Sequence, residues 1–65
     1  MAGALYRELV RLLNEAGCTY VRPAKGSHEF WFSPLTSRHF VVPFDVSKRQ
    51  TANAVLKQAG LPKAF

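Results

Sequence analysis

The 65-residue chain has room for one small hydrophobic core, since a chain of this length buries only about 60% of the surface that its unfolded form exposes. A composition of 48% hydrophobic and 20% charged residues, without repeats or low-complexity segments, argues against a disordered chain. No apolar run approaches the ~18 residues that span a bilayer, and no signal-peptide core follows the N-terminus. We therefore expect a cytoplasmic protein in which residues 1–65 form one domain, without a membrane partner.

The chain is strongly basic. Nine Lys and Arg residues against four Asp and Glu residues give a net charge of +5. The basic residues are spread along the sequence, so only the fold can gather them into a patch. The charge is compatible with an ordinary solvated surface, and it modestly favours a surface that binds nucleic acid or an acidic protein.

No pattern in the sequence is typical of a metal site. Cys18 is the single cysteine and has no His or Cys neighbours at ligand spacing, so we expect a buried, inert thiol. The carboxylates are spread over the chain without ligand spacing: Glu8, Glu15, Glu29 and Asp45. We expect neither a bound metal nor another cofactor.

The first predicted element is an amphipathic helix over residues 4–16. Its apolar side chains recur at spacings of three and four residues: Leu5, Leu9, Leu12, Leu13 and Ala16. Arg11 and Glu15 lie at helical pairing distance on its polar side. Gly17 is expected to end the helix, because glycine closes a helix C-terminus without steric cost.

The first predicted strand covers residues 18–22, which are rich in β-branched and aromatic side chains. Pro23 is expected to end this strand, because proline has no backbone N–H to donate to a neighbouring strand. Residues 24–27 then form a connecting turn.

Residues 28–33 and 38–42 form the second and third predicted strands. The four residues between them, 34–37, predict an antiparallel hairpin. Pro43 is expected to end the third strand.

The last predicted element is a second helix, with Ala52, Val55, Leu56 and Ala59 on its apolar face. Ser47 followed three residues later by Gln50 fits a capping box at its start, and Thr51 is an alternative start. Gly60 and Pro62 are expected to close its end.

The predicted order is therefore helix, three strands, helix. Two amphipathic helices need a common partner, and a three-stranded antiparallel sheet with one apolar face supplies it. The sequence thus predicts a two-layer α+β domain, an arrangement that resembles the double-stranded-RNA-binding fold.

Four segments in register resemble the HicA toxins of type II toxin–antitoxin systems. They are residues 8–17 (ELVRLLNEAG), 25–28 (KGSH), 41–44 (VVPF) and 55–61 (VLKQAGL). Their order and spacing agree over nearly the whole chain. The resemblance implies a small ribonuclease that cleaves messenger RNA, with the histidine of the glycine turn, here His28, as its catalytic residue. It also implies a HicB-type antitoxin that covers the active site.

The chain departs from the HicA pattern at two points. Many members carry a second polar residue or histidine after the catalytic one, where this chain has Glu29. The loop between Phe44 and the second helix is shorter than usual, which alters how its basic residues meet RNA or the antitoxin.

The chemistry of RNA cleavage suits His28. RNA carries its own nucleophile, the 2′-hydroxyl, so an enzyme must remove that proton, stabilise the phosphate charge and protonate the departing 5′ oxygen. A histidine, with an ordinary pKa of about 6.5, exchanges protons near neutral pH. We expect cleavage that does not depend on a metal.

Other residues near His28 are candidates for binding the phosphate. Lys25 is the first candidate to offset its charge, with Arg22 behind it, and the backbone amides of Gly26 and Ser27 offer an anion nest. Lys48 and Arg49, at the start of the second helix, are further candidates for RNA contact.

The other histidine, His39, is not favoured as a partner of His28 in proton transfer. If the hairpin loop holds four residues, His39 pairs with Phe32, roughly 13 Å along the strand from His28. If the register slips by one, the two histidines face opposite sides of the sheet. We expect His39 to be an RNA-facing or a structural residue.

The aromatic side chains of the hairpin allow two interpretations: Phe30, Trp31, Phe32 and Phe40 stack on bases or fill the core. We expect most of them in the core, because so short a chain has few other large apolar residues.

Two further functions stay open. The first is a non-catalytic RNA-binding module, in which replacing His28 matters no more than replacing any surface residue. The second is an interaction domain without affinity for nucleic acid.

Overall fold

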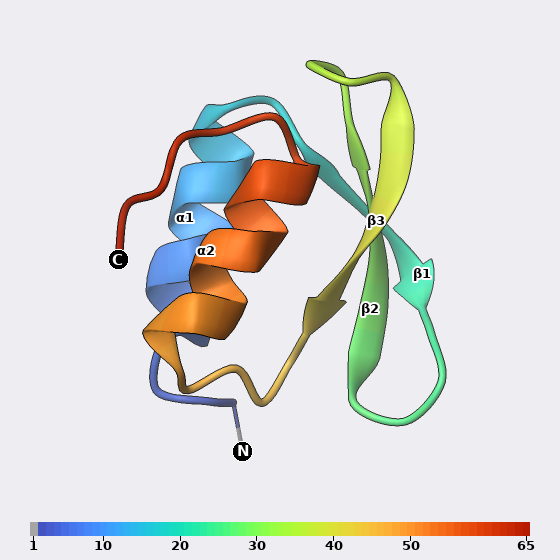
Figure 1. The fold of residues 1–65 in the computed structure, drawn as a ribbon. Helices are drawn as coiled ribbons and strands as arrows, with labels where there is room; N and C mark the ends of the chain where they lie inside the picture. The colour runs from blue at the N-terminus through green and yellow to red at the C-terminus, as the bar shows by residue number, and fades with distance from the viewer. Residues whose placement is uncertain (1) are drawn as a thin grey trace.

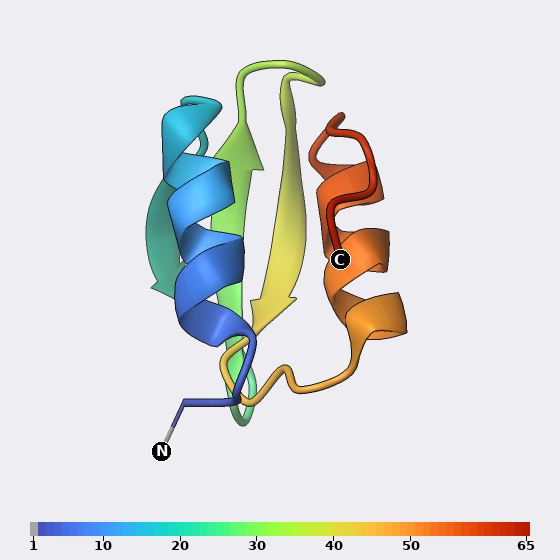
Figure 2. The same ribbon diagram turned by 90° about the vertical axis from the view of Figure 1, so that its left-hand side faces the viewer.

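The computed structural model describes residues 2–65 and has two helices and three strands. In chain order the elements are α1 (Tyr6–Glu15), β1 (Thr19–Pro23), β2 (His28–Ser33), β3 (Arg38–Pro43) and α2 (Arg49–Gln58). The strands form one antiparallel sheet in the order β1-β2-β3. Both helices pack on the same face of this sheet, and its other face is uncovered (Figure 1 and Figure 2). The predicted two-layer α+β fold is confirmed.

The core lies between the helices and the sheet. It consists of buried apolar side chains from all parts of the chain: Leu9, Leu13, Cys18, Trp31, Phe40, Val42, Val46, Ala52, Val55, Leu56 and Ala59. The predicted apolar face of α2 is fully buried, and Leu5, Leu12 and Ala16 of the first helical stripe pack partly buried against this core. Cys18 is a buried free thiol, as expected.

Helix α1 begins at Tyr6, two residues after the predicted start, and ends where Gly17 was expected to end it. The Gly17 N–H donates to Asn14 O at 3.0 Å and the Cys18 N–H donates to Leu13 O at 2.9 Å. These two bonds form a Schellman motif, which satisfies the last carbonyl groups of the helix.

The predicted capping box of α2 is wrong. Lys48, with an extended backbone, is the N-cap, and no side chain caps the helix. Val46, two residues before the N-cap, explains the difference, because it is buried in the core and its carbonyl accepts the Leu5 N–H at 3.1 Å. Because this tertiary anchor determines where the chain enters α2, Ser47 lies outside the helix and exposed.

Strand β1 lies one residue later than predicted and includes Pro23, which pairs with Glu29. A proline is tolerated here because β1 is an edge strand. The pairing with β2 shifts between Tyr20 and Arg22, so Val21 is the extra residue of a β-bulge.

The hairpin of β2 and β3 has the predicted four-residue loop. Phe32 pairs with His39 and His28 pairs with Pro43, so the first of the two registers considered for His39 is confirmed. Strand β3 extends to Pro43, one residue further than predicted. Across residues 2–65 none of the helices is both long and apolar enough to cross a bilayer.

Candidate functional site

The turn between β1 and β2 presents His28. The Ala24 N–H donates to His28 O at 2.8 Å, and the His28 N–H donates to Lys25 O at 3.2 Å. Gly26 has a φ of 65° inside this turn. The turn therefore ends at the first residue of β2 and leaves the imidazole of His28 exposed to solvent.

A second contact fixes the turn against the end of β3. The Phe44 N–H donates to Ser27 O at 2.7 Å. A shallow depression of about 190 Å³ lies at this junction. It is lined by Tyr20, Pro23, Gly26, Ser27, His28, Glu29 and Phe44. Three predicted site residues, Gly26, Ser27 and His28, thus share one small concave surface.

The basic candidates divide between two places. Lys25 lies in the turn itself, and Arg22 lies on β1 opposite Phe30, two residues from His28 on β2. Lys48 and Arg49 lie outside the depression, at the start of α2 in the helix layer. The turn and the start of α2 are both at the lower end of the molecule in Figure 1. The loop from β3 to α2 runs along this end, and its first residue, Phe44, bonds to the turn.

Glu29 lies next to His28 and faces the helix side of the sheet. Its side chain points to the helix layer, where the Tyr6 hydroxyl lies 2.9 Å from both carboxylate oxygens and donates to them. The indole N–H of Trp31 donates to Glu29 Oε1 at 3.0 Å. Glu29 is therefore a partly buried acceptor that ties β2 to α1, directly next to His28.

Tyr6 keeps its proton over a wide pH range. Burial raises the pKa of Tyr6 most, and the hydrogen bond to Glu29 raises it further, from an ordinary value of 10.0 to about 12. Its ring also packs edge-on against Phe44, with ring centroids 4.6 Å apart. Through Tyr6, the start of α1 supports two residues that line the depression.

Sequence reasoning missed Tyr6 and Tyr20 as neighbours of the site. Tyr6 and Glu29 are 23 residues apart in the chain, and no spacing rule connects a helix residue with a strand residue at that separation. The sequence did mark Phe44 and Glu29, because Phe44 ends one of the segments that resemble the HicA toxins and Glu29 departs from the HicA pattern.

The aromatic side chains of the hairpin divide evenly between the two faces of the sheet. Trp31 and Phe40 are buried in the core, whereas Phe30 and Phe32 lie on the uncovered face, where their rings contact His39. The expectation that most of them fill the core is therefore wrong, because only two of the four do. Strand alternation places successive residues of β2 on opposite faces, which is the physical reason.

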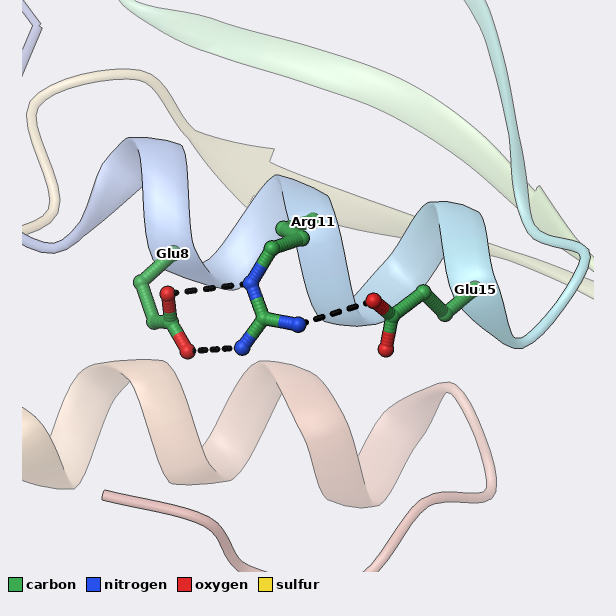
Figure 3. Close-up of polar contacts among 3 residues, drawn as sticks. All are labelled: Glu8, Arg11 and Glu15. Carbon is green, nitrogen blue, oxygen red and sulfur yellow. Dashed lines mark hydrogen bonds and ion pairs between the residues drawn. The ribbon is translucent and has the colours of Figure 1, made fainter.

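Arg11 lies away from this site, on the exposed side of α1. Its guanidinium bonds the Glu8 carboxylate through two nitrogens and Glu15 Oε2 at 2.8 Å (Figure 3). The hydrogen bond from Arg11 holds the pKa of Glu8 below its ordinary value. The predicted Arg11–Glu15 pair is confirmed, and two of the four carboxylates are occupied by this one arginine.

Among the described residues, no three His, Cys, Asp or Glu side chains come together as metal ligands would. The arrangement instead offers one exposed imidazole, a cationic side chain and a glycine turn at one end of the sheet. These groups are suited to proton transfer and to contact with an anion.

A comparison with protein families matches residues 6–61 to the model described as "HicA toxin of bacterial toxin-antitoxin". The chain belongs to the HicA toxin family. The match runs from the first residue of α1 to just beyond the end of α2, so it includes the glycine turn, His28 and the whole sheet. Neither a curated protein nor a solved structure shows significant similarity to this HicA-family chain.

Membership of the HicA family confirms the resemblance of the four sequence segments. It identifies the chain as a toxin of a toxin–antitoxin system. All four segments lie within the matched residues 6–61.

Proposed function

We propose that this HicA-family toxin is a metal-independent endoribonuclease that cleaves messenger RNA with His28 as its proton-transferring side chain. The observation that carries the proposal is the position of His28, exposed at the first residue of β2 and adjoining the Lys25-Gly26-Ser27 turn. An RNA phosphate in the depression would thus meet the imidazole and the backbone amides of the turn, with Lys25 as the next residue of that turn.

The reaction needs no group beyond those of the site and RNA. The 2′ oxygen bonds to phosphorus, the bond from phosphorus to the 5′ oxygen breaks, and a 2′,3′-cyclic phosphate forms. His28 accepts the proton of the 2′-hydroxyl and returns a proton to the 5′ oxygen, so the imidazole ends the cycle unchanged.

The turn supplies the contacts to the phosphate. Its own hydrogen bonds use the N–H groups of Ala24 and His28, so those of Gly26 and Ser27 serve the phosphate oxygens. The Lys25 ammonium offsets the charge that develops on these oxygens. Arg22, Lys48 and Arg49 bind phosphates on either side of the cleaved one.

A HicB-type antitoxin is the proposed inhibitor. An antitoxin that covers the depression would exclude RNA from His28. The net charge of +5 on the toxin favours fast, salt-sensitive association with an acidic antitoxin surface.

Replacing His28 tests the proposal. Wild type, His28→Gln and the control Lys57→Gln, an exposed residue in the last turn of α2, are purified and incubated with a generic messenger RNA, with and without EDTA. We expect His28→Gln to cleave about 10²- to 10⁴-fold more slowly, because it lacks the general acid and base. We expect Lys57→Gln to match wild type and EDTA to have no effect.

Two controls separate chemistry from folding and binding. Circular dichroism of His28→Gln should match wild type, because the replaced side chain is exposed. A 2′-O-methyl group at the cleaved nucleotide should abolish cleavage. RNA binding without cleavage by any of the three proteins would favour the non-catalytic RNA-binding module, and rescue of an EDTA-treated sample by magnesium would overturn metal independence.

A further inference from the structure

The uncovered face of the sheet carries a row of planar side chains. On β2, His28, Phe30 and Phe32 alternate with Trp31 and Ser33, which are buried towards the helices. Both phenylalanines are only partly buried, although they belong to the central strand of the sheet. No helix covers this face in Figure 1.

The row crosses all three strands. The Arg22 guanidinium carbon of β1 lies 4.5 Å from the centroid of the Phe30 ring. On β3, the ring of His39 lies with its centroid 6.0 Å from that of Phe30 and 5.1 Å from that of Phe32. We call these four side chains, Arg22, Phe30, His39 and Phe32, the aromatic row.

The surroundings of the aromatic row suit a polyanion. All four carboxylate side chains of the chain lie elsewhere: Glu8 and Glu15 on α1, Glu29 behind the sheet and Asp45 in the loop after β3. Arg22 adds a positive charge to the row itself. The row therefore combines flat ring surfaces with an unopposed cation, the combination found in surfaces that bind single-stranded nucleic acid.

We propose that the aromatic row binds the unpaired bases of a single-stranded RNA segment next to the phosphate held beside His28. This inference rests on the proposed function and names the form of RNA that the site takes. Phe30 is two residues from His28 on the same strand face, about 6.6 Å along the strand, and Phe32 is the same distance further. The row thus starts beside the candidate catalytic residue and leads away from it.

The geometry favours single strands over duplexes. Bases stack on Phe, His and the plane of an Arg guanidinium only when they are splayed out of a helix, because in a duplex their faces are covered by neighbouring base pairs. Stacking is tolerant of sequence, since every base has a flat face. The row therefore predicts a preference for unpaired RNA with little dependence on which bases it contains.

Binding of an uncleavable RNA tests the inference. The probe is a short single-stranded oligonucleotide with 2′-O-methyl riboses, used alone and annealed to its complement. Phe32→Leu and Phe30→Leu each remove one ring and keep an apolar side chain. Phe65→Leu is the matched control, because it makes the same change in a partly buried residue packed against the core.

We expect Phe32→Leu to raise the dissociation constant of the single strand about tenfold, in line with the loss of one stacked base. Phe30→Leu should act in the same direction, and Phe65→Leu should leave the constant unchanged. The duplex should bind more weakly and should not respond to Phe32→Leu. Thermal unfolding identifies a variant that is not folded, and the other ring variant then carries the test.

The outcomes separate this inference from the proposed function. Equal single-strand affinities for wild type and both ring variants, or preference for the duplex, would overturn the row as an RNA platform even if wild type cleaves RNA through His28. Ring-dependent binding by a protein that cleaves nothing would support the row and count against the nuclease. Variants that lose affinity for a purified antitoxin and keep full affinity for RNA would make the row a protein-binding surface and overturn the inference.

Discussion

Tyr6 and Glu29 show how single residues support the site from behind. Glu29 is the residue next to His28 in sequence, yet it points into the opposite layer and accepts hydrogen bonds from Tyr6 and Trp31. A strand residue fixed in this way limits the freedom of its neighbours. The exposed imidazole of His28 thus rests on a backbone that the hydrogen bonds of Glu29 hold in place.

Raising the pH is expected to weaken the fold through Tyr6. Its pKa of about 12 in the folded protein lies above the ordinary value of 10.0, so its contribution to stability is complete below pH 10 and is lost as the pH rises towards 12. The free energy of unfolding, measured with urea, should therefore differ between wild type and Tyr6→Phe by a constant amount below pH 10. This difference should shrink between pH 10 and pH 12.

Tyr6→Phe serves as the control for the other titratable groups, because all of them are present in both proteins. A difference between the two proteins that stays constant up to pH 12 would show that Tyr6 does not keep its proton in the folded state.

At the same scale, the sequence predicted His28 as a site residue but did not predict the contact between Tyr6 and Glu29 behind it. The run Lys25-Gly26-Ser27-His28 is continuous, so a turn and the strand after it place these residues together by local geometry alone. The contact of Tyr6 with Glu29 depends instead on how a helix docks on a sheet. Alternation along β2 predicts the layer into which Glu29 points, and it does not predict the partner found there.

At the scale of elements, hydrogen bonds connect the β2–β3 hairpin with the end of α2. The buried Ser33 hydroxyl donates to Ala59 O at 2.6 Å, and the Leu35 N–H donates to Ser33 Oγ at 3.2 Å. Gly60 follows directly with a φ of 87° and ends α2 as Gly17, with a φ of 89°, ends α1. The two helix ends are therefore alike in backbone and differ in what surrounds them.

Alanine at these two glycines is expected to separate backbone strain from crowding. An added Cβ at Gly60 would lie 3.0 Å from Thr36 Cγ2 and 3.2 Å from Leu35 Cβ, whereas at Gly17 the nearest contact is Pro34 Cγ at 3.4 Å. Gly17→Ala should cost about 1–2 kcal/mol of unfolding free energy from the left-handed conformation alone. Gly60→Ala should cost more, because the hairpin loop must also move.

Urea unfolding of both variants and wild type measures the two costs. A loss at Gly60 no larger than that at Gly17 would show that the loop gives way freely and that α2 does not depend on the hairpin for its end.

Element boundaries mark the limit of local sequence patterns. Both glycine ends were predicted correctly, because the Schellman motif is determined within a few residues. The start of α2 was not, because the burial of Val46 outweighs the helix-start pattern at Ser47. The hairpin register was predicted only for a given loop length, and the four-residue loop of the structure gives the register predicted for that length.

At the scale of the whole molecule, three of the four acidic side chains are paired within the fold, and the basic residues proposed to bind RNA lie in two regions. Glu8 and Glu15 bond to Arg11, and Glu29 accepts hydrogen bonds within the fold. One basic region comprises Lys25 and Arg22 at the turn and on the sheet, and the other comprises Lys48 and Arg49 at the start of α2. Both regions lie at the lower end of the molecule in Figure 1, where the loop from β3 to α2 bonds to the turn through Phe44.

A single strand of RNA that follows this end from α2 past His28 to the aromatic row would contact both basic regions. Removing one cation that binds a phosphate should then reduce the steepness of the plot of log affinity against log salt by about 0.7. We expect this reduction for Lys25→Gln, Lys48→Gln and Arg49→Gln, measured with the 2′-O-methyl oligonucleotide, and none for Lys57→Gln. A salt dependence of Lys48→Gln and Arg49→Gln equal to that of Lys57→Gln would confine RNA to the turn and the sheet, and the start of α2 would have no role in binding.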